Sequence, residues 1–322
     1  MTKKGKRAKK PSPDKSTAAQ KSGSRTRKLT RFQRRKQDKK QSRESSKMPG
    51  SFRLVAQVWN IFQKYWKPLG GIVLVYLILN IIFASGLSSL SSSVSDIKAN
   101  LEADSDRSLT NALGGFGSLV GSAGANSSQT ASILQTILII IESLVIIWAL
   151  RQLLAGSKIG VKQAYYRSTG QLVPFLLVLI VIFIQLLPVT LGTAIVSTVL
   201  SAIFNSSTLL TTIMIICFMA LAAWSVYMVS SSAFALYIVT LPDMQPRQAL
   251  KSAKNLVRFR RWPIVRKVLF LPIFILLAMA LAVIPLILWA NWFVAPVFYV
   301  LSMVAILFVH SYLYSLYRSL LE

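Results

Sequence analysis

The fold is decided by the segment between Arg167 and Asp243, which contains no charged side chain. Residues 172–200 read LVPFLLVLIVIFIQLLPVTLGTAIVSTVL, and residues 209–228 read LLTTIMIICFMALAAWSVYM. Each run reaches the roughly 20 residues that a helix needs to cross a bilayer. The polar sequence Asn-Ser-Ser at 205–207 is typical of a turn between them. The segment therefore predicts two consecutive membrane-spanning helices.

Four more apolar segments extend this pattern on both sides. They lie at residues 69–90, 132–150, 268–290 and 293–314. The sequence thus predicts an all-α, polytopic membrane protein, with six transmembrane helices within residues 51–322. The Ser/Gly/Asn-rich stretch 91–131 is predicted to be a long loop on the extracytoplasmic side.

Composition adds a second part to the chain. Of 322 residues, 53% are hydrophobic and the mean hydropathy is +0.54, yet 37 Lys and Arg face 10 Asp and Glu, a net charge of +27. Residues 1–50 alone carry 19 basic and 3 acidic side chains. A segment with so little to bury cannot offset its ordering entropy. We therefore expect a disordered polybasic tail at 1–50 in front of the membrane domain, and not a soluble enzyme.

The distribution of Lys and Arg predicts the orientation. Every basic residue after the tail lies in segments on the same side as the N-terminus, except Lys98 and Arg107 in the 91–131 loop. Loops rich in Lys and Arg stay in the cytoplasm. The sequence therefore predicts a multi-pass protein of the cell (inner) membrane with both termini in the cytoplasm.

The tail carries candidate anion-binding residues. They form one basic cluster: Arg34, Arg35, Lys36, Lys39 and Lys40. Such cations bind anionic lipid headgroups, and they bind the phosphates of RNA equally well. Three alternatives remain open: contact with anionic lipid, contact with RNA or a ribosome, and a solvated extension that only keeps the N-terminus in the cytoplasm.

Residues 246–262, PRQALKSAKNLVRFRRW, predict a basic amphipathic helix. At 100° per residue, five cations share one side: Arg247, Lys251, Lys254, Arg258 and Arg261. Apolar residues occupy the opposite side, and Trp262-Pro263 is predicted to end the helix. It either lies flat on the membrane with its cations toward phosphates or packs its apolar side on other helices.

The same design precedes two other spans. Residues 52–68 place aromatic residues on one side and end in Trp-Lys-Pro, and residues 161–174 form a weaker copy. Each copy comes directly before an odd-numbered span. The pattern predicts three repeated units, each an interfacial amphipathic helix followed by a membrane hairpin.

One loop resembles a known family. Leu241-Pro242-Asp243, then Ala249-Leu250-Lys251-Ser252, a basic helix and Trp262 are similar to the cytoplasmic loop of bacterial YciC-like and glycerophosphoryl diester phosphodiesterase membrane-domain-like proteins. The resemblance covers about residues 51–320. It implies a six-helix membrane body without an assigned activity, and it implies no functional residue that could be carried over. The long 91–131 loop and the polybasic tail depart from the family pattern.

Three polar residues are predicted at similar depth inside the membrane: Asn80, Glu142 and Gln185. A carboxylate at mid-membrane costs about 2.5–3.5 kcal/mol on insertion scales, so it is by default a functional candidate. We expect the three to form a hydrogen-bonded layer between helices. The alternative is a proton- or cation-coupled transport site centred on Glu142.

Cysteine and histidine offer no catalytic or metal-binding pattern. Cys217 and His310 are the only residues of their kind, and a zinc site needs three or four converging ligands. We therefore expect no metal, no cofactor and no catalytic residue. The predicted function is a non-enzymatic scaffold or lipid-interacting membrane protein. The alternatives are the Glu142 transporter and a membrane tether for RNA or ribosomes.

Overall fold

The computed structural model describes residues 49–84, 94, 109–122, 129–203, 207–241, 244–258 and 260–321. Apart from its last two residues, the predicted tail at 1–50 lies outside this part, and so does most of the 91–131 loop. Within the described ranges the elements are helices, and no strand is found. The all-α prediction is therefore confirmed.

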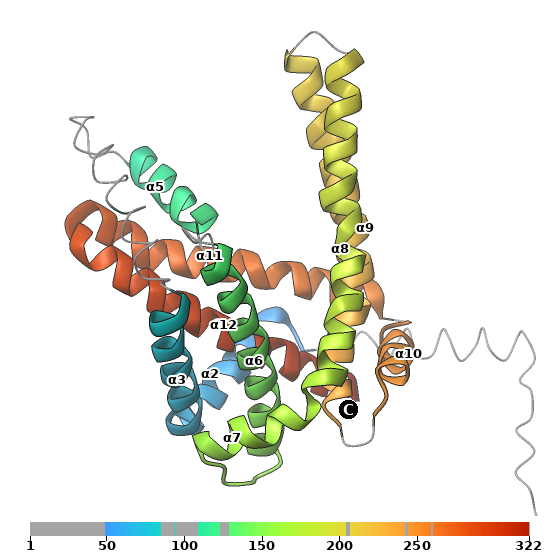
Figure 1. The fold of residues 1–322 in the computed structure, drawn as a ribbon. Coiled ribbons are helices and arrows are strands. Elements are labelled where there is room, and N and C mark those ends of the chain that lie inside the picture. The colour runs from blue at the N-terminus through green and yellow to red at the C-terminus, as the bar shows by residue number, and fades with distance from the viewer. Residues whose placement is uncertain are drawn as a thin grey trace, which may run out of the picture. The chain divides into compact units, whose positions relative to one another are not determined.

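Six of the helices are long and apolar enough to cross a membrane (Figure 1). They are α3 (Trp66–Ala84), α6 (Gln129–Leu154), α8 (Leu172–Ile203), α9 (Ser207–Val239), α11 (Arg261–Trp289) and α12 (Asn291–Leu321). Each one overlaps a predicted span, although residues 85–90 of the first predicted span lie outside the described residues. The chain is thus a polytopic membrane protein with six spanning helices.

Several helices run beyond the predicted spans. α11 begins at Arg261 instead of 268, and α12 continues to Leu321 instead of 314. α9 continues past the apolar span at 209–228 to Val239, in the direction of Thr240 that its sequence indicates. The predicted ends follow hydropathy, which drops where polar side chains begin. Backbone hydrogen bonding does not stop at such residues. Exposed Arg266 of α11 and Arg318 of α12 can reach into water or headgroups while their stems stay on the helix.

Three short helices precede spanning helices, as the repeat predicts. α2 (Ser51–Lys64) comes before α3, α7 (Val161–Ser168) with the 3-10 turn η2 (Thr169–Gln171) comes before α8, and α10 (Pro246–Val257) comes before α11. We call the helix ends next to α2, α7 and α10 the basic side, because the Lys and Arg residues of 51–68, 151–171, 241–267 and 315–321 belong to it.

The three short helices pack in the same way. Each one buries residues spaced four positions apart: Leu54 and Val58 in α2, Ala164 and Ser168 in α7, and Ala249, Ala253 and Val257 in α10. α2 packs on α12, α7 packs on α6, and α10 packs on α9. Positions i and i+4 share one helix face. Each short helix is therefore held on the body by one narrow stripe.

The expected continuous helix over 246–262 is wrong. α10 ends at Val257, and Arg261 opens α11. Trp262 and Pro263 therefore begin the next helix and do not end α10. Proline is tolerated in a first helical turn because the amide it lacks would have no partner there. Pro68 occupies the corresponding place in the first turn of α3.

The predicted 91–131 loop contains another helix, α5 (Leu109–Ser122). It packs on α11 and buries Phe116 and Leu119 in the same core as α3 and α6. The apolar residues at 113, 116, 119 and 120 have helical spacing. Glycine and serine between them hide this helix in the sequence. The connection between α3 and α6 therefore contains a helix, α5, which the sequence did not predict.

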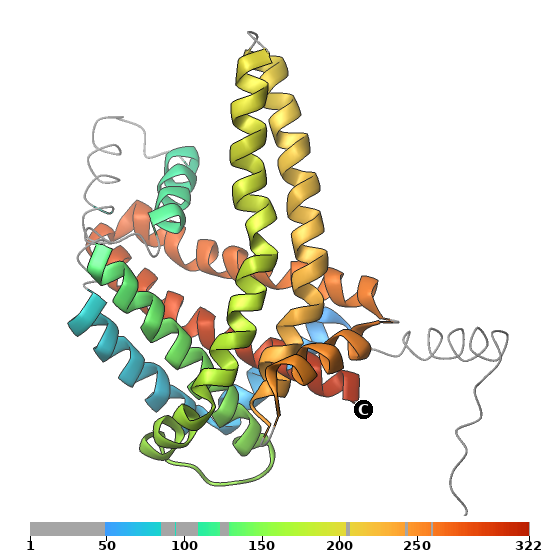
Figure 2. The ribbon, with the colours of Figure 1, turned by 45° about the vertical axis from the view of Figure 1, so that its right-hand side comes forward.

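The core lies among α3, α6, α11 and α12 and continues toward the basic side of α8 and α9. Buried Tyr76, Val145 and Phe298 belong to the first part, and Phe175 and Phe234 belong to the second. The remaining lengths of α8 and α9 run side by side (Figure 2), and the described side chains of residues 183–200 and 211–224 include no buried hydrophobic one. In a bilayer, lipid chains would cover those faces.

The packing of α3 on α7 gives a test of the fold. A Cβ at Gly71 would lie 2.6 Å from Val161 Cγ2, whereas a Cβ at Gly70 would have nothing within 4 Å. We expect Gly71→Ala to lower the free energy of unfolding by about 1–3 kcal/mol relative to Gly70→Ala. Thermal unfolding in detergent measures it. Adding Val161→Ala should restore stability, and equal stability of the two glycine variants would contradict the packing.

Candidate functional site

Glu142 is a buried carboxyl group in α6, with 1% of its surface exposed. The hydroxyl of Tyr165, in α7, donates a 2.7 Å hydrogen bond to Glu142 Oε2. Oε1 has no hydrogen-bond partner among the described residues. A buried polar atom without a partner is costly. Glu142 is therefore attached to α7 by a single hydrogen bond and keeps one unused acceptor.

Asn80 forms a second polar contact inside the membrane domain. The Tyr299 hydroxyl donates to Asn80 Oδ1 at 2.8 Å, and Asn80 Nδ2 donates to the Tyr76 hydroxyl at 3.4 Å. The first bond joins α3 to α12, and the second stays within α3. Hydrogen bonds of this kind hold membrane helices together, each contributing about 1 kcal/mol. Asn80 thus acts as a structural link.

The expected layer of Asn80, Glu142 and Gln185 does not form. Gln185 lies on α8 beside residues of α9 and α10, and its Oε1 is buried without a partner among the described residues. Counting from the helix ends gives the depth of a side chain but not the direction in which it points. The hydroxyls of Tyr165 and Tyr299, which lie on other elements, are the hydrogen-bond partners of Glu142 and Asn80 instead. In the sequence, the signal that could have predicted these bonds is a tyrosine hydroxyl within an apolar segment.

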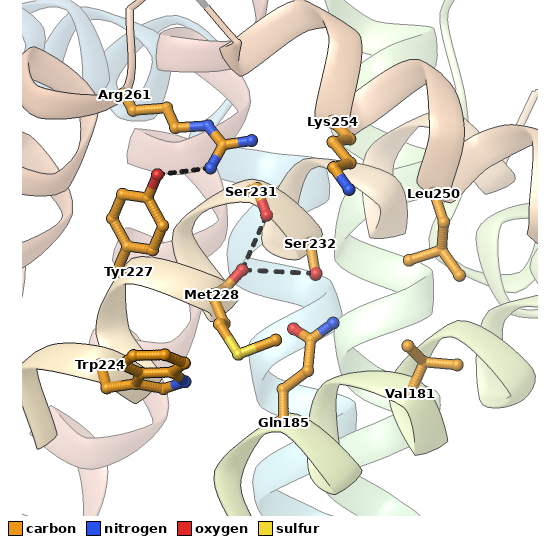
Figure 3. Close-up of a pocket in the computed structure, with 10 residues that line it drawn as sticks. All are labelled: Val181, Gln185, Trp224, Tyr227, Met228, Ser231, Ser232, Leu250, Lys254 and Arg261. Carbon is orange, nitrogen blue, oxygen red and sulfur yellow. Dashed lines mark hydrogen bonds between the residues drawn. The ribbon is translucent and has the colours of Figure 1, made fainter. Parts of the chain in front are cut away.

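Gln185 lines a cavity of about 630 Å³ between α8, α9, α10 and α11 (Figure 3). Its walls come from ten residues: Val181, Gln185, Trp224, Tyr227, Met228, Ser231, Ser232, Leu250, Lys254 and Arg261. Ligand sites of proteins typically measure about 300–1,000 Å³, with apolar walls and a few convergent polar groups. We refer to this cavity as the α8–α11 pocket.

Arg261 is held in place at the pocket. Its Nη1 donates to the Tyr227 hydroxyl at 2.6 Å, and its guanidinium lies 5.1 Å from the centre of the Tyr227 ring. The second contact is a cation–π interaction. The guanidinium is therefore oriented in advance, and donors besides Nη1–H remain for another group.

The pocket has two cations and no carboxylate among the described residues. Lys254 and Arg261 both line it, and Glu142 is the only acidic residue in the described ranges. Glu142 bonds to Tyr165 and does not line the pocket. Within the described structure, no protein carboxylate balances the two charges. An anion from outside the chain would be attracted to them.

Hydrogen-bond acceptors lie next to these cations. Ser231 Oγ donates to the Met228 carbonyl oxygen at 2.8 Å, and Ser232 Oγ donates to the same oxygen at 3.5 Å. Both hydroxyl oxygens keep lone pairs that can accept. Gln185 Oε1 is a third acceptor in the pocket (Figure 3). The pocket thus combines a cationic part with a group of acceptors.

The remaining predicted cations of α10 lie on its outer surface. Arg247, Lys251 and Arg258 are exposed, whereas the opposite side of α10 packs on α9 through alanines and Val257. The sequence left two alternatives for the apolar side of α10, the membrane surface or other helices. The structure supports packing on other helices. The five tail residues Arg34, Arg35, Lys36, Lys39 and Lys40 lie outside the described residues.

Exposed tryptophans mark both ends of the spanning helices. Trp59, Trp66 and Trp262 are 61–78% exposed on the basic side, and Trp289 and Trp292 are 89% and 76% exposed at the opposite ends of α11 and α12. Tryptophan is enriched at both membrane–water interfaces. In a bilayer, these tryptophans would favour a position of the basic side at one membrane–water interface.

The described residues contain no cluster of His, Cys, Asp and Glu that could hold a metal ion. His310 instead lies with Nδ1 3.3 Å from the hydroxyl of Tyr237, and Cys217 is half-buried in α9. No protein-family model, curated protein or solved structure matches the chain. The resemblance to the YciC-like proteins therefore stays a prediction.

The Glu142–Tyr165 contact can be tested with adjacent tyrosines. Tyr165→Phe would leave the buried carboxyl group without its hydrogen bond, so we expect a loss of about 1–2 kcal/mol in stability. Tyr166→Phe removes a hydroxyl from a side chain that is 74% exposed, and it should have little effect. Detergent unfolding of both variants provides the comparison, and equal stabilities would show that the bond contributes nothing.

Proposed function

We propose that the protein is a non-enzymatic integral membrane protein whose basic side binds anionic phospholipid headgroups. The observation that carries this proposal is the charge balance of the described residues. Their cations gather on the basic side, and their only carboxylate is the buried Glu142. Anionic headgroups at a membrane surface attract such cations, each contributing about 1 kcal/mol. In this proposal the lipid supplies the negative charge next to these cations.

The packing of the short helices supports this role. α2, α7 and α10 are held on the body by their buried stripes, so their cations stand at fixed positions at the bilayer surface. A scaffold that gathers anionic lipid needs fixed charges more than a reactive group. In this proposal the basic side, both termini and the polybasic tail face the cytoplasm in the cell (inner) membrane, following the positive-inside rule.

Glu142 supports a second candidate function. Its Oε1 is buried and has no partner among the described residues, as expected for a carboxyl group that binds a proton or cation during transport. The proposed tether for RNA or ribosomes depends on residues 1–50, which lie almost entirely outside the described residues. Membership of the YciC-like family would agree with the six spanning helices and would add no activity.

The proposed orientation predicts which residues a membrane-impermeant thiol reagent reaches. In a Cys217→Ser background, Ser252→Cys on the exposed side of α10 should react only after the cells are permeabilised. Ser118→Cys, on an exposed position of α5, should react in intact cells. The reverse labelling pattern would contradict the cytoplasmic placement of the basic side.

Lipid selectivity tests the proposed function. With full-length protein in mixed vesicles, spin-labelled phosphatidylglycerol should associate more strongly than spin-labelled phosphatidylcholine at low salt. The ratio should fall toward one in 1 M salt, where the Debye length is about 3 Å. Deleting residues 1–50 should lower the ratio in part, because the tail contributes cations as well. A ratio of one at low salt would rule out the proposal.

A further inference from the structure

We propose that the α8–α11 pocket binds one phospholipid whose headgroup carries both a phosphate and hydroxyl groups. This inference rests on the proposed function. The basic side is proposed to bind anionic lipid, and the inference assigns part of that binding to one site and one lipid class. The pocket lies where α10 turns into α11, level with the interfacial tryptophan Trp262. A lipid headgroup occupies the same depth in the bilayer.

The phosphate belongs beside Lys254 and Arg261. Both cations line the pocket, and in the described structure neither has a carboxylate partner. Arginine and lysine bind phosphate oxygens through charge-assisted hydrogen bonds, which are stronger than neutral ones. Because Tyr227 already fixes the guanidinium of Arg261, little side-chain entropy is lost when the phosphate binds.

The hydroxyl groups belong beside Gln185 and the two serines. Gln185 Oε1 is a buried acceptor without a donor among the described residues. Ser231 and Ser232 use their hydrogens on the Met228 carbonyl oxygen, so toward a ligand their oxygens can only accept. A phosphodiester offers no donor to these atoms at neutral pH. A polyol headgroup, such as the glycerol of phosphatidylglycerol, supplies the missing donors.

The acyl chains would leave the pocket along α8 and α9. Trp224 and Met228 line the pocket and are 63% and 38% exposed. Beyond them, the two helices present apolar side chains such as Leu191 and Ile195 to their surroundings. A bound lipid would keep its chains in the bilayer along these helices while its headgroup occupies the pocket between α8, α9, α10 and α11.

Native mass spectrometry of the full-length protein in detergent tests the site. The probes are phosphatidylglycerol, phosphatidic acid, which has no headgroup hydroxyl, and phosphatidylcholine. Wild type should retain one phosphatidylglycerol in preference to phosphatidic acid, and phosphatidylcholine least. Lys254→Gln with Arg261→Gln should lower phosphatidylglycerol occupancy roughly tenfold or more. Gln185→Leu should remove only the preference over phosphatidic acid.

The matched control removes the same charge from α10 outside the pocket, with Arg247→Gln and Lys251→Gln, and should change the occupancy less than about twofold. Should the pocket double variant not fold, Ser231→Phe fills the pocket and keeps both cations, and it should also prevent binding. Equal losses in pocket and control variants would overturn the site while leaving the proposed function intact. No preference for phosphatidylglycerol over phosphatidylcholine in wild type would overturn both.

Thermal unfolding distinguishes binding of a lipid from binding of free phosphate. Phosphatidylglycerol should raise the Tm of the wild-type protein, because a ligand that binds only the folded state stabilises it. Inorganic phosphate or glycerol phosphate at millimolar concentration should leave the Tm unchanged, since neither has chains to place along α8 and α9. A Tm increase as large with free phosphate would show that the site takes a soluble anion and would overturn the lipid assignment.

Discussion

The structure depends on an excess of positive charge that the acidic residues of the described part of the chain do not neutralise. Cations collect at the ends of the spanning helices next to α2, α7 and α10, and the only carboxylate in the described ranges is Glu142, which is buried in α6. Ion pairs within these ranges therefore cannot neutralise the basic side. In a membrane, phospholipid headgroups supply negative charge at the same depth, which connects the charge pattern to both the orientation and the proposed ligand.

At the bilayer surface, lipid headgroups can pair with charged side chains. Inside the bilayer, polar groups need partners from the protein itself. Asn80 obtains one from Tyr299, and Glu142 obtains one from Tyr165. These bonds join α3 to α12 and α6 to α7. Gln185 differs, since its oxygen faces a pocket instead of another helix. The same requirement thus explains two structural links and one candidate ligand contact.

The six spanning helices could be predicted from hydropathy alone, since an uncharged run of about 20 residues has few alternatives to crossing the bilayer. Their ends could not, because helical hydrogen bonding continues through charged residues such as Arg266 at the start of α11 and Arg318 near the end of α12. α5 was hidden by its glycines and serines. The break between α10 and α11 was missed because the 100° spacing of cations continues across it.

The pocket was only partly predictable. Lys254 and Arg261 were chosen from the sequence as members of one helix face, yet they reach the pocket from two different helices. Gln185 was chosen for its depth, whereas its direction depends on how α8 packs against α9. Tyr227, Ser231 and Ser232 resemble ordinary residues of a membrane helix in the sequence. What brings them together is the packing of α10 on α9, which no local pattern encodes.

The most direct test is a cryo-EM structure of the full-length protein in nanodiscs that contain phosphatidylglycerol. The account predicts headgroup density in the α8–α11 pocket, with phosphate oxygens within hydrogen-bond distance of Lys254 Nζ and the Arg261 guanidinium, and with headgroup hydroxyls near Gln185. Density showing both cations paired with a carboxylate of the chain itself, such as Asp243, with no lipid between α9 and α10, would contradict it.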